Sequence, residues 1–180
     1  MSLTLAHCCR VGCLALWLPP AVLADSMAAT QSVSVVLSPV GKVILPASIT
    51  LLNGALAFSP YTASLPVLFR ARTSAAGSGS ITVQSSGDFT PSGGPSVAAG
   101  KLTYTCAAAA YGAACTGTQI VSPTVQRPVL TLPRSSCIAG GNGCSTVDPA
   151  SINLLFRLEN DVSLPTGTYS VQLTFTISCT

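Results

Sequence analysis

The C-terminal stretch Thr166–Thr180 constrains the fold most, because its apolar and polar residues alternate without a break. From Tyr169 to Cys179, every odd position is aromatic, aliphatic or cysteine, and every even position is serine, threonine or glutamine. Successive side chains of a strand point to opposite faces, so the pattern predicts a strand with one buried and one solvent-exposed face. Such a strand is stable only against other strands, which the rest of the chain must supply.

Further stretches alternate in the same way between turn residues, and none keeps a helical period. Asn53-Gly54 between two apolar runs predicts a hairpin with a type I′ turn. Three prolines limit the strand over 125–132 to an edge or irregular position. We therefore expect an all-β fold, a single Ig-like antiparallel β-sandwich of about eight strands. The other expected strands are 32–39 (the first strand, with a short continuation at 42–45), 49–52, 55–58, 65–73, 80–85, 101–106, 115–121 and 151–159.

The N-terminal residues are typical of a secretory signal peptide. Arg10 supplies a short basic region, and the apolar run Val11–Ala24 is shorter than the ~20 residues of a membrane-spanning helix. We expect residues 1–24 to be cleaved after Ala24 and residues 25–180 to form the single domain, without a membrane span. A lipoprotein signal ending at Cys13 is the alternative, although most of the apolar run follows that cysteine. The mature protein is expected outside the cytoplasm: secreted, periplasmic or at the cell surface.

The mature chain would be poor in charge. Seven of the eight basic residues remain after Arg10 is removed, against five acidic ones, and the basic residues are scattered along the chain. This distribution gives no track for nucleic acid, so we expect no nucleic-acid partner. Little charge repulsion opposes lateral association of such a surface, which favours other protein subunits as partners through edge-strand pairing.

Five cysteines follow the signal peptide, and an exported chain meets an oxidising compartment. We expect disulfides between Cys106 and Cys115 and between Cys137 and Cys144, because each pair brackets a loop of small residues. Loops this short give only the low end of the usual ~2–4 kcal/mol. A bond between Cys106 and Cys179 is the competing arrangement. In the favoured arrangement Cys179 is left over, as a buried thiol or as one half of an intermolecular bond.

The mature chain lacks the residues of common catalytic sites. The single histidine, His7, lies in the signal peptide, so no Ser-His-Asp or Cys-His arrangement can form. Glu159 and Asp161 could donate oxygens to calcium or could belong to a solvated turn between strands. Asp88 is expected to form a turn. We expect no enzyme activity, no catalytic residue, no cofactor and no metal ion.

Two tyrosines are candidates for stacking on a sugar. Tyr61 and Tyr111 are expected in loops, where they could contact a glycan or could cover an edge of the core. The long stretch Ser86–Gly100, expected to be a loop or a lid-like crossover, and the loop Ala107–Ala114 could add to such a site.

The C-terminal strand carries a Gly-x-Tyr-x-x-x-Leu-x-Phe-x-Ile pattern that resembles bacterial surface proteins with immunoglobulin-like sandwiches, such as pilin-like and spore-coat-U-like subunits. The resemblance implies fold and location rather than a site. The penultimate residue here is Cys179, where pilins usually carry tyrosine, and Ser32–Leu37 could be a donor strand or an ordinary first strand. The residues that carry the resemblance are Gly167, Tyr169, Leu173, Phe175 and Ile177.

Together these features predict a non-enzymatic extracytoplasmic structural or adhesive subunit that assembles by strand addition into a surface structure or pilus. A secreted glycan-binding module is the alternative.

Overall fold

The computed structural model describes residues 31–54, 56–74, 77–109, 111–132 and 149–180. The chain divides into two compact units, residues 1–35 and residues 36–180. Within the first unit, residues 31–35 are described; they are exposed and belong to no strand. The expected signal peptide, Cys137 and Cys144 lie outside the described residues.

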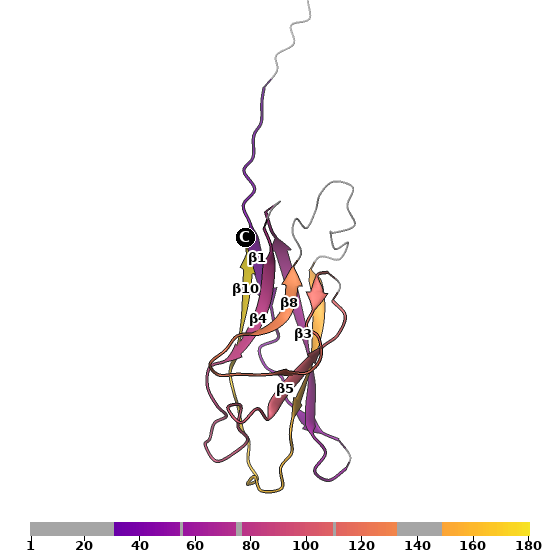
Figure 1. Ribbon diagram of the computed structural model, residues 1–180, viewed down its shortest axis with the longest axis vertical. Helices are drawn as coiled ribbons and strands as arrows, with labels where there is room; N and C mark the ends of the chain where they lie inside the picture. The colour runs from indigo at the N-terminus through magenta and orange to yellow at the C-terminus, as the bar shows by residue number, and fades with distance from the viewer. Residues whose placement is uncertain (1–30, 55, 75–76, 110, 133–148) are drawn as a thin grey trace, which may run out of the picture. The chain divides into compact units, whose positions relative to one another are not determined.

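The second unit consists of two antiparallel sheets, and the part of it that the structure describes contains no helix (Figure 1). The predicted all-β sandwich is therefore confirmed, with ten strands among the described residues. The first sheet has the order β1-β3-β9-β5-β7, with β2 paired to β3. Its strands are β1 (Val40–Ile44), β2 (Leu52–Asn53), β3 (Tyr61–Arg72), β5 (Leu102–Cys106), β7 (Gln119–Ile120) and β9 (Ala150–Leu158).

The second sheet has the order β10-β4-β8-β6. It is built on β4, which pairs with β10 on one side and with β8 on the other. Its strands are β4 (Gly79–Ser85), β6 (Ala113–Ala114), β8 (Arg127–Leu132) and β10 (Leu173–Cys179).

The core lies between the sheets and follows the alternation of the sequence. The inward residues of β9 are almost completely buried, whereas Leu155 on the opposite face is 50% exposed. The predicted faces of residues 80–85 and 151–159 are thereby confirmed. The largest fully buried side chains include Tyr104, Phe69, Phe156, Ile81, Leu102, Leu130, Ile152 and Leu154.

The first predicted strand, 32–39, is wrong. Residues 31–39 are not in a strand, and the first strand is Val40–Ile44. The reason lies in the partner: Val40 pairs with Arg72, the last residue of β3, so the residues before Val40 have no ladder to join. Pro39 also lacks a backbone N–H. Arg72 Nε donates to Ser38 O at 2.9 Å, which is a side-chain contact and not strand pairing.

The predicted Asn53-Gly54 hairpin turn is also wrong. Leu52 and Asn53 pair with Thr62 and Tyr61, so the reversal takes several residues instead of two. Gly54 does not have the positive φ that a type I′ turn requires. Positive φ occurs instead at Phe58, with a value of 59°.

The stretch over 115–121 needs correction as well, whereas the irregular strand predicted over 125–132 is present as β8. Within the first, only Gln119–Ile120 forms a strand, β7; β6 precedes this stretch and belongs to the other sheet. The second forms β8 between β4 and β6, although it is edge-like near Pro128, because β6 pairs only with Leu130 and Thr131. The β4–β8 register shifts at Ile81/Thr82, next to the proline.

The connection 86–100 is a packed crossover between the two sheets and not a lid. Phe89 and Val97 within it are buried. The Asp88 carboxylate accepts hydrogen bonds from the backbone N–H groups of Phe89 and Val97 and from the Ser96 hydroxyl. Asp88 is therefore the turn former that the sequence predicts.

Candidate functional site

The inward row of the C-terminal strand is only partly buried, unlike the corresponding rows of β4 and β9. The alternation predicts a buried face here, and the structure corrects that expectation: the row packs against the core, but nothing in the described chain covers its outer side completely. The strand itself begins at Leu173, and Ser170 makes an isolated bridge to Thr90. We call this row the β10 edge row: Tyr169, Val171, Leu173, Phe175, Ile177 and Cys179.

The backbone of β10 is paired on one side. Among the described residues, β4 is its only strand partner. Ser86 N donates to Gln172 O, and Thr180 N donates to Ser78 O, both at 2.9 Å, so the even-numbered residues face β4. In an antiparallel pair the intervening residues point their N–H and C=O groups the other way. The odd-numbered residues of β10 therefore direct their N–H and C=O groups to the side on which no described strand pairs with β10.

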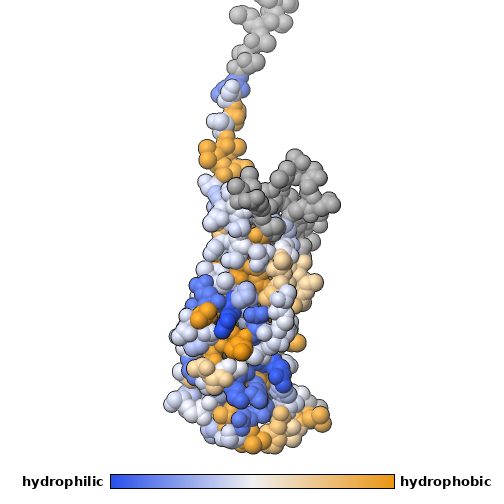
Figure 2. Space-filling model, in the orientation of Figure 1, coloured by the Kyte–Doolittle hydropathy of each residue, from blue (hydrophilic) through white to orange (hydrophobic). Residues whose placement is uncertain are grey.

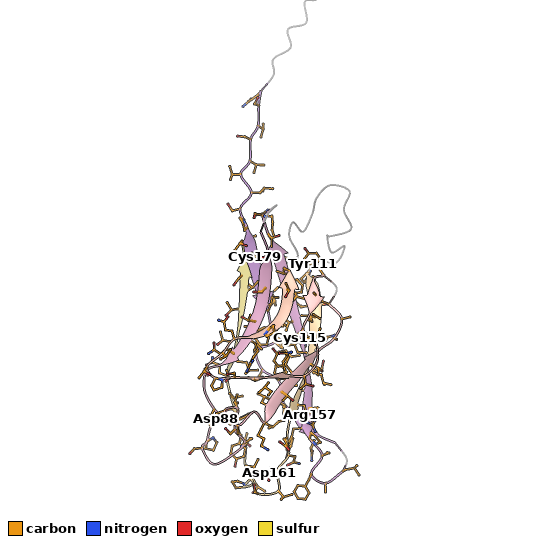
Figure 3. The ribbon with its side chains drawn as sticks, viewed as in Figure 1. Asp88, Tyr111, Cys115, Arg157, Asp161 and Cys179 are labelled. Carbon is orange, nitrogen blue, oxygen red and sulfur yellow. A yellow bond between two sulfur atoms is a disulfide. The ribbon has the colours of Figure 1, made fainter. Side chains whose placement is uncertain are left out.

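One end of β10 is closed by β1. A Cβ added at Gly41 would lie 2.9 Å from Ile177 Cγ1 and 3.0 Å from Cys179 Sγ, so the β1 backbone rests directly on these side chains. Cys179 is the free cysteine of the described chain and lies partly buried (Figure 3). Burial raises the pKa of its thiol, and a hydrogen bond from the Arg72 backbone N–H opposes this only in part. The thiol is therefore protonated at neutral pH.

The residues before β1 include exposed apolar residues in an alternating pattern. Val33, Val35 and Leu37 occupy every second position and are 92%, 77% and 66% exposed; of the residues between them, Ser34 is polar, whereas Val36 is apolar and also exposed. An apolar row at every second position is the pattern of a strand with one buried face. The same chain thus contains an open sheet edge and an exposed segment, Ser32–Ser38, whose length and alternation match it. We call this the N-terminal segment.

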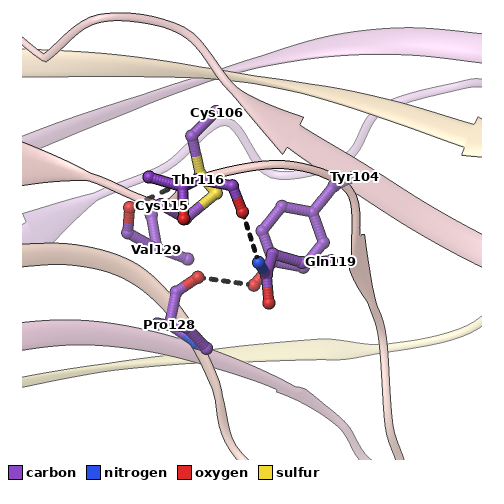
Figure 4. The surroundings of a disulfide bond; sticks show 7 residues. All are labelled: Tyr104, Cys106, Cys115, Thr116, Gln119, Pro128 and Val129. Atoms are coloured by element: carbon purple, nitrogen blue, oxygen red, sulfur yellow. Dashed lines mark hydrogen bonds between the residues drawn. A yellow bond between two sulfur atoms is a disulfide. The ribbon is translucent and has the colours of Figure 1, made fainter.

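The opposite side of the sandwich is held covalently (Figure 4). Cys106 at the end of β5 and Cys115 just after β6 form a disulfide with a Cα–Cα distance of 5.5 Å. Cys106 is therefore not bonded to Cys179. Nearby, the buried Tyr104 donates from Oη to Pro128 O at 2.8 Å, and burial raises the pKa of this tyrosine. One side of the sandwich is thus closed by a bond between the sheets, while the β1–β10 side is open.

The acidic turn after β9 is occupied by contacts within the protein. Glu159 Oε2 lies 2.7 Å from Lys101 Nζ, and Asn160 Nδ2 donates to Ser59 O at 3.1 Å. Asp161 accepts from the N–H and hydroxyl of Ser163, and these two hydrogen bonds lower the pKa of its carboxyl. Among the described residues no group of three or more His, Cys, Asp or Glu side chains gathers as metal ligands would. The turn holds neighbouring loops together.

The two candidate sugar-stacking tyrosines do not form a common surface. Tyr61 is the first residue of β3, so its expected place in a loop is wrong. Tyr111 does lie in a loop, within the segment that the disulfide closes. Both side chains are half-buried against the core. This packing favours the structural alternative for these residues, as covers of a core edge.

A comparison with models of known protein families found no match, and a comparison with curated proteins found none either. In the described part of the chain, no helix is long and apolar enough to cross a membrane. The alternation of the N-terminal segment and the proline that ends it were visible in the sequence; the exposure of the β10 edge row was not, because alternation identifies a face but not how completely it is covered.

Proposed function

We propose that this protein is a non-enzymatic structural subunit outside the cytoplasm, which assembles by adding the N-terminal segment of one subunit to the β10 edge of another. The observation that carries the proposal is the coexistence of an edge paired on one side and an exposed, alternating segment in one chain. The Cys106–Cys115 disulfide is consistent with an oxidising compartment. The resemblance of the last strand to pilin-like and spore-coat-U-like subunits supports the same kind of role.

The side chains and the backbone both favour addition of a strand. In an antiparallel pair, opposite residues share a face, so Val33, Val35 and Leu37 would lie beside odd-numbered members of the β10 edge row. Burying each such side chain contributes roughly 1.5–3 kcal/mol. Association itself costs roughly 4–15 kcal/mol, so the apolar contacts alone are marginal. The backbone ladder on the unpaired side of β10 supplies the remaining stabilisation and makes the contact directional.

Assembly of the purified mature protein tests the proposal. Wild type and Val35→Asp are compared by light scattering after size-exclusion chromatography and by electron microscopy. Val35 is exposed, so its replacement leaves the sandwich intact while placing a charge where an apolar contact is needed. Leu155→Asp is the matched control, because Leu155 is also an exposed apolar residue but lies in β9, away from the β10 edge.

We expect wild type and Leu155→Asp to form oligomers or filaments and Val35→Asp to remain monomeric. Wild type that stays monomeric at every concentration, or Val35→Asp that assembles like wild type, would show that strand addition does not occur. Far-UV circular dichroism of Val35→Asp verifies that the sandwich has folded.

A further inference from the structure

A second exposed apolar surface lies at the end of the sandwich where β3 begins. Leu56 and Phe58 belong to the turn between β2 and β3, and Val162 belongs to the turn after β9. Asn160 Nδ2 donates to Ser59 O at 3.1 Å and thereby ties the two turns together. Figure 2 shows apolar side chains gathered at this end. We call the surface the end patch, formed by Leu52 (67% exposed), Leu56 (77%), Phe58 (61%) and Val162 (71%).

Phe58 is held in an unfavourable conformation without being buried. Its φ of 59° lies in the left-handed region, which is unfavourable for a bulky residue. In a core, packing would offset this strain, but the Phe58 ring is mostly exposed. The turn therefore exposes an aromatic side chain, and its strained backbone destabilises the free subunit. Strain of this kind at an exposed side chain is expected of a residue that contacts a partner.

The end patch and the start of β1 lie at opposite ends of β3. Leu52 pairs with Thr62 at the beginning of β3, and Val40 pairs with Arg72 at its end. Lys42 and Arg72 lie at the β1 end, whereas Asp161, in the turn that carries Val162, and Arg157, paired with Thr62, both lie at the end of the patch. An ion pair, Lys101–Glu159, also lies near the patch and is neutral as a pair.

The direction of strand addition determines which ends of two copies meet. β10 runs toward its Cys179 end, which contacts Gly41 of β1. A segment added antiparallel to β10 would therefore leave the acceptor at the Leu173 end, the end of the end patch. Because Pro39 and β1 follow the segment directly, the β1 end of the donor would then face the end patch of the acceptor.

A segment added parallel to β10 would have the opposite result. The donor would leave at the Cys179 end, so the β1 ends of two copies would face each other and could exchange segments as a closed dimer. In that dimer the end patch and the strained Phe58 would stay exposed. Antiparallel pairs are also slightly more stable per residue.

We infer that the end patch is the docking surface for the β1 end of the next copy of this chain, so that copies join head to tail in an open chain. This inference rests on the strand addition proposed above. Antiparallel addition brings a second copy to the patch, and Phe58 acquires the apolar partner that it lacks in the free subunit. A heterologous contact of this kind repeats without closing.

The test compares full mature protein carrying Phe58→Asp with wild type, Val35→Asp and the exposed-residue control Leu155→Asp. The critical concentration for assembly is measured by sedimentation, and particle shape by electron microscopy. We expect Phe58→Asp to raise the critical concentration by more than about tenfold, the effect of losing a central apolar contact, while Leu155→Asp leaves it unchanged. Phe58→Gly removes the ring and the strain, so this variant should assemble poorly although its monomer is at least as stable as wild type.

The outcomes separate this inference from the proposed function. If Val35→Asp abolishes assembly but Phe58→Asp and Phe58→Gly assemble like wild type, strand addition stands and the end patch is not a docking surface. Wild type that stops at closed dimers, unaffected by Phe58→Asp, would also overturn the inference. If Val35→Asp assembles like wild type, strand addition itself is wrong, and the head-to-tail inference falls with it.

Discussion

At the scale of single residues, Asp88 illustrates how one carboxylate fixes a long connection. The crossover 86–100 has no strand pairing along most of its length, yet Phe89 and Val97 are buried. Partial burial would raise the pKa of Asp88, but hydrogen bonds from Ser96, Val97, Phe89 and Ala98 outweigh it and lower the pKa below its ordinary value. The charged form of Asp88 therefore holds the turn, because these donors bind a carboxylate more strongly than a carboxylic acid.

We expect Asp88→Asn to remove a pH-dependent part of the stability. A pKa that is lower in the folded state means stability that is present above the unfolded value, ~3.9, and is lost as pH falls through the folded value. The difference in the free energy of unfolding between wild type and Asp88→Asn should therefore be largest at neutral pH and shrink below about pH 4. Chemical denaturation at pH 7 and pH 3 measures it. A difference that does not change with pH would contradict the role of the charge.

At the scale of elements, the contact between β1 and β10 depends on a missing side chain. Gly41 has no Cβ, and this lets the β1 backbone rest on Ile177 and Cys179. The contact closes one end of the open side of the sandwich and leaves the rest of the β10 edge row accessible. The short strand β1 therefore limits which part of β10 an added strand can pair with.

We expect Gly41→Val to separate the two strands and destabilise the protein by about 1–3 kcal/mol, the usual cost of overpacking. The Cys179 thiol should then react faster with an alkylating reagent, because β1 no longer covers it. Denaturant unfolding and the alkylation rate are the two measurements. Gly87→Val is the control, since nothing lies within 4 Å of a Cβ at that position. Equal losses in the two variants would mean that the β1–β10 contact contributes nothing specific.

The elements also show what sequence can and cannot predict. The alternation of residues 80–85 and 151–159 gave the correct buried faces, because both strands have neighbours on either side and a core across from one face. The same alternation at 32–39 predicted a strand that is absent. Alternation shows which residues can share a face, but it does not show whether a neighbouring strand is present to pair with them. The ladder of β3 ends at Arg72, a fact of tertiary structure that no local pattern contains.

The candidate site was predictable to a similar extent. The residues of the β10 edge row and the possible donor role of Ser32–Leu37 follow from the sequence alone. The open edge of β10 and the exposure of Phe58 cannot be predicted from the sequence, because both depend on which other parts of the folded chain pack over them. Asn53-Gly54 shows the same limit: a strong local turn signal gave way to a longer reversal in which Phe58, a residue disfavoured at positive φ, takes the left-handed conformation.

At the scale of the whole molecule, the proposed assembly implies that a subunit could complete its own sheet. A second copy of Ser32–Ser38 placed after Thr180 through an Asn-Gly turn would run back antiparallel along the free side of β10. We expect this chain to be monomeric and its thermal midpoint to rise by about 2–4 °C for each kcal/mol gained. Calorimetry and light scattering measure both.

An appended segment with serine in place of Val33, Val35 and Leu37 is the matched control for that chain. It has the same length and backbone but no apolar row, so it should neither raise the midpoint nor prevent assembly. If both appended chains behave alike, the apolar row does not recognise the β10 edge.

The one-sided pairing of β10 also has a consequence for the interval between synthesis and assembly. Backbone hydrogen bonds do not depend on the side chains of the added strand. An unpaired sheet edge can therefore bind other copies of the subunit, fragments of it or unrelated extended peptides. At high concentration, newly synthesised subunits would therefore join in the wrong order or bind the wrong partner, unless another chain covers the β10 edge until assembly. The chain with the appended segment should escape this hazard, and its refolding yield at high concentration should exceed that of the natural chain.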